Sequence, residues 1–310
     1  MTRVGLVLGA GGVTGEAFHR GVLRALRDVA GFDARRAEVI VGTSAGALVA
    51  ASLRCSGSAA LPPAAAAPPD AALSRLPDPR ALLAVARRPW QARAGVLATS
   101  LLPAGRQPTD IFTAAIRARC GSAWPAEDTY ICAVRRRDGR RVVFGMPGAP
   151  DIDVATAVGA SCAIPGYFRP VVHGGEVYVD GGVHSPTNAD VLAGRGLDLV
   201  VVSSPMSVSP RAVRPKLDLS VRMMWHRYVA AERHGLERHG TAVLTVEPGG
   251  DTLRALGLNA LRAARVDQIE ELAHDATVAE LNRPAMAGRV ALLTGGPNGR
   301  NGRSGRKRPA

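Results

Sequence analysis

The sequence predicts an α/β protein with a mainly parallel sheet, and three observations lead to this fold class. An apolar run at Val4–Leu8 precedes a glycine-rich loop, and apolar residues then recur at helical spacing. A second strand-like run near Glu38–Val41 leads into a second helix-like stretch, Ala45–Leu53. Strands that alternate with helices in this order are typical of parallel, layered sheets.

The second half of the chain continues the pattern of short strands and helices. A hairpin is expected at Tyr130–Val134 and Arg141–Phe144, because the Asp138-Gly139 pair between them suits a tight turn. Further strands are expected at residues 176–179, 197–202 and 242–246, and further helices at 154–163, 221–231 and 269–276.

Two stretches depart from this pattern within or after the predicted domain, residues 1–294. The segment 56–108 opens with low-complexity Ala/Pro sequence that suits a flexible linker. Its apolar second half suits either a helical insertion packed on the core or a mobile, apolar cap. The tail, residues 295–310, is basic and lacks apolar periodicity, so we expect it to be disordered.

The charge of the chain bears on its partners. The net charge is +13, but the cations are dispersed and aromatic residues make up only 4% of the chain. Nucleic-acid binders usually combine a basic stripe with stacking rings, so we expect no nucleic-acid partner. Transient contact with an anionic membrane surface is the role that this charge favours.

The cysteines and the apolar runs bear on the compartment. The four cysteines (Cys55, Cys120, Cys132 and Cys162) form no C-x-x-C pair, so we predict neither a zinc site nor a disulfide framework, but structural thiols. No run reaches the roughly 18 apolar residues of a membrane span, and the start does not resemble a cleavable signal. We therefore expect a cytoplasmic protein, peripheral at the membrane at most.

A serine stands between two glycines, Gly42 and Gly46, where the predicted second strand becomes a helix. This arrangement is typical of a nucleophile elbow, in which the flanking glycines let the neighbouring backbone pass close to an exposed Ser44 hydroxyl. The N-terminus of the helix then favours negative charge at the same corner. The alternative is an ordinary connection in which Ser44 only caps the helix.

A first glycine loop, with glycines at positions 9, 11, 12 and 15, also joins a strand to a helix. Such a loop can hold a dinucleotide pyrophosphate, or its amides can stabilise the oxyanion of an acyl-transfer reaction. The dinucleotide alternative lacks an acidic residue that clearly ends a second strand. A P-loop is excluded, because the chain contains no Gly-Lys-Ser/Thr.

A serine nucleophile needs a base, and Asp180 is the best candidate. None of the seven histidines lies in a context typical of a catalytic base. Asp180 ends a predicted strand and precedes Gly181 and Gly182, and a carboxylate can act as a base if partial burial raises its pKa. The alternative is an ordinary Asp-Gly turn.

These three motifs, in this order, resemble the patatin-like phospholipase family. The flanking segments "GLVLGAGGVTGEAFHRGVL", "ASCAIPGYFRPV" and "VDGGVHSPTNADVL" agree with it, and the likeness runs from about Val4 to Asp198 and more faintly to Leu281. It implies a three-layer α/β/α fold with a mainly parallel central sheet. It also implies hydrolysis of lipid or fatty-acyl esters through an acyl-enzyme, with no metal or cofactor.

The resemblance also implies the roles of individual residues. Ser44 would be the nucleophile and Asp180 its general base, and the amides of Gly11, Gly12 and Ala45 would form the oxyanion hole. The motif glycines would be Gly9, Gly15, Gly42, Gly46, Gly181 and Gly182. Thr14 departs from the family, which often carries Arg or Lys at that place. Two alternatives remain: a Ser-Asp-His esterase of the α/β-hydrolase type, using His184 or His274, and a catalytically weakened lipid-binding protein.

Overall fold

The computed structural model describes residues 2–55, 105–209, 217–257, 260–261 and 265–295. The predicted Ala/Pro linker, most of the candidate cap and the basic tail lie outside the described residues. Residues 105–108, which we assigned to the linker, are described: Gln107 bridges to Phe168, and Gly105 is buried against the same segment.

The centre of the protein is a mixed sheet with the order β5-β6-β3-β2-β1-β7-β8, in which β4 also pairs with β3. The strands from β3 to β8 along this path are parallel, whereas β4, β5 and β6 pair in antiparallel fashion. Their bounds are β1 Val4–Leu8, β2 Val39–Thr43, β3 Asp128–Arg135, β4 Arg140–Phe144, β5 Val171–His173, β6 Glu176–Asp180, β7 Leu199–Ser203 and β8 Ala242–Val246.

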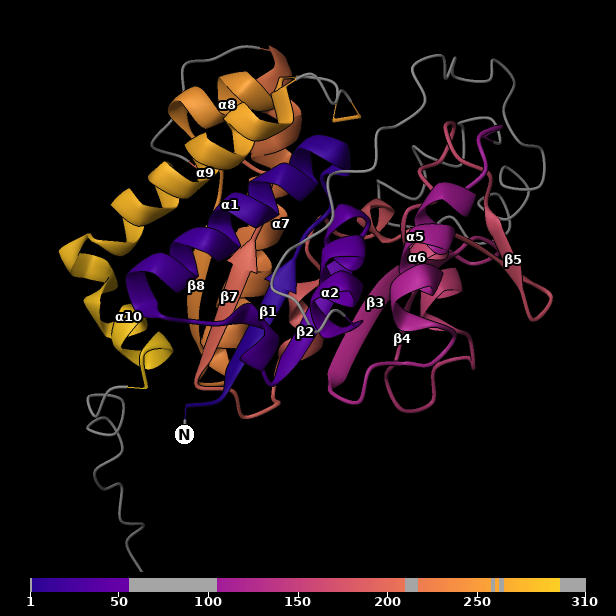
Figure 1. The fold of residues 1–310 in the computed structure, drawn as a ribbon, viewed down its shortest axis with the longest axis horizontal. Helices are drawn as coiled ribbons and strands as arrows, with labels where there is room; N and C mark the ends of the chain where they lie inside the picture. The colour runs from indigo at the N-terminus through magenta and orange to yellow at the C-terminus, as the bar shows by residue number, and fades with distance from the viewer. Residues whose placement is uncertain (1, 56–104, 210–216, 258–259, 262–264, 296–310) are drawn as a thin grey trace, which may run out of the picture.

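Helices cover both faces of this sheet, which gives three layers (Figure 1). Alternate β1 residues point to opposite faces, as strand geometry requires: Leu6 belongs to one core cluster and Val7 to the other. The first face carries α1 Gly12–Ala30, α2 Ala45–Cys55, α5 Asp110–Cys120, α6 Val154–Ser161, α8 Gly250–Leu256, α9 Val266–Leu281 and α10 Ala287–Leu293, and the second carries α7 Leu217–Arg238. The predicted α/β/α class with a mainly parallel sheet is confirmed.

The register of β3 brings two strand ends together. β2 pairs with the first part of β3, where Thr43 is opposite Cys132. β6 pairs with the last part, where Asp180 is opposite Ala133. Because β4 occupies the other edge of β3, β2 and β6 share one edge and meet end to end. The residue after Thr43 and the residue that ends β6 are therefore neighbours in space.

Most predicted elements are found, with shifted ends. The predicted 38–41, 176–179 and 197–202 strands correspond to β2, β6 and β7, and the predicted hairpin to β3 and β4. Helix α5, strand β5 and helices α8 and α10 had no sequence prediction. Within the described ranges, no helix combines the length and apolar character needed to cross a bilayer.

The expectation of four structural thiols is wrong for two of them. Cys55, the last residue of α2, is joined by a disulfide to Cys120, the last residue of α5, with 5.0 Å between their Cα atoms. The two cysteines are 65 residues apart in the chain, so no short sequence motif could predict that they pair. Cys132 and Cys162 are free and buried, as expected.

We predict that this disulfide contributes to stability by restricting the unfolded chain. Cys55→Ser should lower the free energy of unfolding by roughly 2–5 kcal/mol, the range for loss of a native disulfide. The measurement is denaturant unfolding of both proteins with and without a reductant. Cys55→Ser is the control, since it lacks the disulfide and a reductant should not change its unfolding. A wild-type midpoint that does not move on reduction would contradict this contribution to stability.

Candidate active site

Ser44 has a backbone conformation that few non-glycine residues adopt. It lies between β2 and α2 with φ at 53°, in the left-handed region. This conformation costs a residue with a Cβ about 1–2 kcal/mol. The Ser44 amide donates to the Ser161 hydroxyl at 2.9 Å, and that hydroxyl donates to the Cys132 carbonyl at 2.6 Å. Ser161 thus holds the strained turn against β3. The turn is as sharp as the predicted elbow requires, and the role of Ser44 as a nucleophile stays a prediction.

The two glycines beside Ser44 are needed for close backbone contacts. A Cβ on Gly46 would lie 1.9 Å from the carbonyl oxygen of Leu8, at the end of β1. A Cβ on Gly42 would lie 2.6 Å from the Cα of Ala47. The first turn of α2 therefore packs directly on the end of β1, which leads into the first glycine loop.

Asp180 lies beside Ser44 and is only 5% exposed. Its carboxylate accepts hydrogen bonds from the Ser44 side chain and from the Gly182 amide, the latter at 2.7 Å. Burial raises the pKa of Asp180 to about 6, because desolvation penalises the charged form more than the two hydrogen bonds favour it. A carboxyl group with this pKa is a competent proton acceptor near neutral pH.

The glycine after Asp180 also has no room for a side chain. A Cβ on Gly181 would lie 2.2 Å from the Cys132 carbonyl oxygen. The chain can therefore turn tightly over β3 and direct the Gly182 amide back to Asp180.

The first glycine loop lies against the same corner. Gly12 has φ at 58° and begins α1, while a Cβ on Gly11 would lie 2.6 Å from Gly15 and from Pro205. Among the described residues, no hydrogen-bond acceptor is found for the amides of Gly11, Gly12 and Ala45. Amides at the N-termini of α1 and α2 are suited to hold negative charge.

A small cleft opens beside Ser44. Its wall is mainly apolar, and Glu16 is the one charged side chain among the described residues that line it. Such a wall can receive a hydrocarbon chain next to the hydroxyl. The lining residues are Gly12, Val13, Glu16, Ser44, Ala45, Leu48, Phe112, Cys162, Ile164, Phe168 and Leu261.

Sequence reasoning missed a network that holds the segment after Asp180. The Glu232 carboxylate on α7 is buried and accepts hydrogen bonds from the side chains of Ser185 and Thr187 and from the Ala189 amide. Burial raises the pKa of Glu232. No local pattern could reveal these contacts, because Glu232 is more than 40 residues further along the chain.

Asn188, also missed, links this segment to the elbow. Its backbone is left-handed, with φ at 55°. Its side-chain amide nitrogen donates to the Thr43 hydroxyl at 3.1 Å and to the Ser185 carbonyl at 3.0 Å. Its side-chain oxygen lies 3.1 Å from His184 Nδ1 and accepts from Arg141 at 3.2 Å. Thr43, the residue before Ser44, is therefore held by the loop that follows Asp180.

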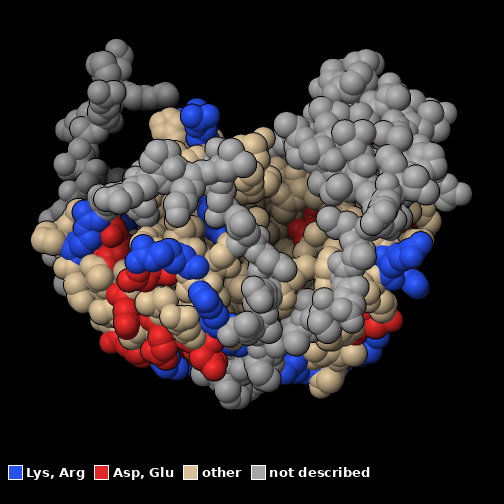
Figure 2. Space-filling view, turned by 90° about the horizontal axis from the view of Figure 1, so that it is seen from above, with Lys and Arg blue, Asp and Glu red and all other residues tan. Residues whose placement is uncertain are grey.

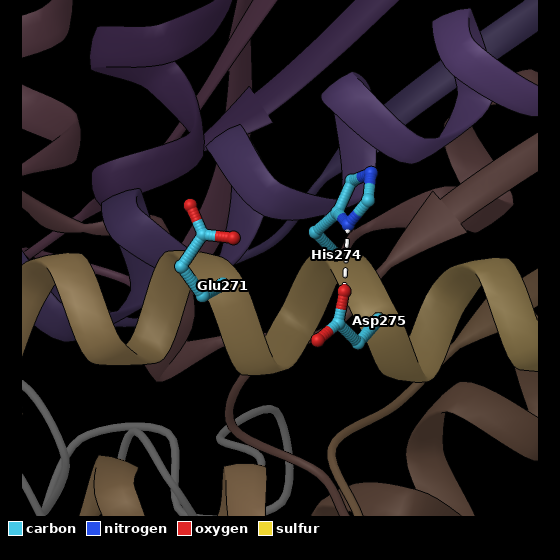
Figure 3. A group of neighbouring side chains, drawn as sticks. All are labelled: Glu271, His274 and Asp275. Carbon is cyan, nitrogen blue, oxygen red and sulfur yellow. Dashed lines mark hydrogen bonds and ion pairs between the residues drawn. The ribbon is translucent and has the colours of Figure 1, made fainter.

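His274, one of the two candidate triad histidines, lies on α9 with carboxylates at both ring nitrogens. Nδ1 is 2.9 Å from Asp275 and Nε2 is 3.2 Å from Asp28. Glu271, His274 and Asp275 share one helix face (Figure 3), and their ligand atoms lie within 4.8 Å of one another. Since Glu271 is also paired with Arg24, ion pairing between α1 and α9 accounts for this group, and we propose no metal site there.

Charged side chains of both signs are interspersed on the face seen in Figure 2, and that face is hollowed near its centre. Many arginines are paired with carboxylates, as Arg20 is with Glu270 at 2.7 Å and Arg141 with Asp190 at 2.6 Å. The expectations about nucleic acid and membrane partners remain predictions.

Two comparisons with known proteins complete the description of the site. The crystal structure of VipD from Legionella pneumophila is similar at 11% identity and a TM-score of 0.42, over 91% of this chain and 66% of that one, so the chain spans less than two thirds of its length. A family model described as "Patatin-like phospholipase" matches residues 6–193, which include Ser44, Asp180 and both glycine motifs. The chain belongs to the patatin-like phospholipase family.

Proposed function

We propose that this protein is a lipid acyl hydrolase that cleaves carboxylic esters through a Ser44 acyl-enzyme. The observation that carries the proposal is the position of Ser44, in a left-handed turn at the end of β2, beside the buried Asp180 that ends β6. The Ser44 side chain interacts with the Asp180 carboxylate, whose pKa burial raises to about 6. Family membership supports an activity on lipid esters in general. The apolar cleft beside Ser44 supports a substrate with a hydrocarbon chain.

The first half of the reaction forms the acyl-enzyme. The Ser44 Oγ attacks the ester carbonyl carbon while Asp180 accepts the hydroxyl proton. The carbonyl oxygen becomes negative, and the amides of Gly11, Gly12 and Ala45 stabilise it. When the tetrahedral intermediate collapses, the bond to the alcohol oxygen breaks, and Asp180 returns its proton to that oxygen.

The second half releases the fatty acid. Asp180, again a carboxylate, accepts a proton from a water molecule, and the resulting hydroxide attacks the acyl carbon. Collapse of the second intermediate breaks the bond to Ser44, and the proton on Asp180 returns to the serine oxygen. Each step uses groups of this chain and water alone.

Ser44→Ala should abolish ester hydrolysis, with a loss on the order of 10³-fold or more. The fold should survive, because the change removes one oxygen that faces the cleft. The measurement is the initial rate on a soluble p-nitrophenyl ester and on phospholipid vesicles. Ser52→Ala is the matched control, since Ser52 is a buried serine in the helix that follows Ser44, α2, but does not line the cleft. If the two variants had equal rates, Ser44 would not be the nucleophile.

Asp180→Asn should be damaging for a different reason. The amide has nearly the same shape but cannot accept the serine proton, so the rate should fall by roughly 10² to 10⁴. The free energy of unfolding at neutral pH should rise, by about 3 kcal/mol at most, because the native state no longer buries a charge. If Asp180→Asn lowered both the rate and the free energy of unfolding, the lost activity would point to misfolding rather than to loss of a base.

The rate should depend on pH through Asp180. The carboxylate form is active, so kcat/KM should decline as the pH falls through about 6, the pKa of Asp180. The same raised pKa means that the native state binds this proton more tightly than the unfolded chain does. The Asp180 contribution to the free energy of unfolding should therefore rise as the pH falls from about 6 toward 3.8.

A soluble p-nitrophenyl ester, whose own charge is constant over this range, is the suitable substrate for the pH profile. An acidic limb near the ordinary pKa of an aspartate would contradict a buried base. If the acidic limb persisted in Asp180→Asn, it would reflect the titration of another group.

A further inference from the structure

His19 is a buried histidine that the proposed reaction does not use. It lies in the second turn of α1, has no exposed surface, and does not line the cleft. Both ring nitrogens are engaged: Nε2 lies 2.8 Å from the Gly9 carbonyl oxygen, and Nδ1 lies 2.8 Å from the Ser203 hydroxyl. The ring therefore joins α1 to the start of the glycine loop and to the end of β7.

The partners determine which nitrogen carries the proton. A carbonyl oxygen only accepts hydrogen bonds, so Nε2 must be protonated and donate to Gly9. In the neutral ring Nδ1 then accepts from the Ser203 hydroxyl. Burial lowers the pKa of His19 to about 4, against the opposing effect of the Gly9 hydrogen bond, so the ring is neutral at physiological pH.

The Gly9 carbonyl has a second donor, which comes from the other loop. The Gly46 amide, in the first turn of α2, donates to it at 3.2 Å. The Gly9 amide in turn donates to the Ser203 carbonyl at 3.0 Å, and a Cβ on Gly9 would lie 2.8 Å from the Pro186 carbonyl oxygen. Gly9 is thus a crowded junction between the glycine loop, the nucleophile elbow and β7.

We propose that His19 is a positioning residue of the esterase site, which fixes the glycine loop relative to the Ser44 elbow through the Gly9 carbonyl. The inference rests on the proposed function. Oxyanion donors act only within about 2.7–3.1 Å of the developing charge, and a displacement of about 1 Å can cost 10²-fold in rate. Gly11 and Gly12 are only two and three residues after Gly9, so a shift of Gly9 moves the amides that would hold the oxyanion.

The test compares two substitutions that differ in which nitrogen they replace. The Gln amide nitrogen reaches the place of Nε2 and can donate to Gly9, whereas the shorter Asn amide reaches only the place of Nδ1. We expect His19→Asn to lower kcat by roughly 10- to 100-fold with KM changed less than about threefold, and His19→Gln to stay within about fivefold of wild type. His173→Gln is the matched control, since His173 Nε2 also contacts a carbonyl, that of Asp151 at 2.7 Å, but lies on the edge strand β5.

Inhibition by a transition-state analogue separates a positioning role of His19 from a merely structural one, which would leave the inhibition constant unchanged. An alkyl trifluoromethyl ketone forms a hemiketal oxyanion on the serine, so its inhibition constant should rise in His19→Asn by the factor by which kcat/KM falls. The acidic limb of the pH profile should stay near 6 in His19→Gln, because it belongs to Asp180. Loss of that limb would make His19 the base and overturn the positioning role.

A measurement on the wild-type protein keeps the inference testable if His19→Asn does not fold. Nitrogen chemical shifts of the His19 ring should report a neutral ring protonated at Nε2 at pH 7. A ring protonated at Nδ1, or a charged ring, would contradict the proposal, as would wild-type kinetics in a folded His19→Asn. Failure of the proposed function looks different: there wild type and Ser44→Ala would hydrolyse esters at the same rate.

Discussion

The left-handed turn at Ser44 is the constraint on which the rest of the site depends. A residue with a Cβ adopts this conformation only where the surroundings compensate for its cost. Here Ser161 holds the Ser44 amide, and Gly46 allows α2 to pack on the Leu8 carbonyl oxygen. The same contact brings the end of β1, and with it the first glycine loop, to Ser44. One strained residue thus fixes both the hydroxyl and the position of the candidate oxyanion amides.

The proposed mechanism also requires a base that is charged but only weakly hydrated. Pairing along one edge of β3 brings Asp180 to the corner where β2 ends. Its described partners are a hydroxyl and an amide, so desolvation dominates and its pKa rises. Thr14, at the place where the family often has a cation, directs its hydroxyl toward the Gly11 and Ala260 carbonyls, each 3.4 Å away. At this place the neutral Thr14 hydroxyl, and not a cation, contacts the carbonyls of the first glycine loop and of Ala260.

Much of this site was predictable, because its motifs are local. The elbow, the glycine loop and the Asp180 turn each occupy a few consecutive residues, and glycine spacing reveals the need for close backbone contacts. Residues that act across the fold gave no such signal. His19 has the spacing of an ordinary core position in α1, and Glu232 lies far along the chain from the loop it holds. The Cys55–Cys120 disulfide was missed for the same reason, and disulfides are more typical of oxidising compartments than of the expected cytoplasm.

The most direct test of the central claim is to locate the covalent adduct formed by a long-chain fluorophosphonate. The reagent should modify one residue, and peptide mass spectrometry should find the adduct on Ser44. It should be absent in Ser44→Ala and form more slowly in Asp180→Asn, because the serine then lacks its base. An adduct on another residue, or none on a folded wild-type protein, would contradict the account of Ser44 as an activated nucleophile.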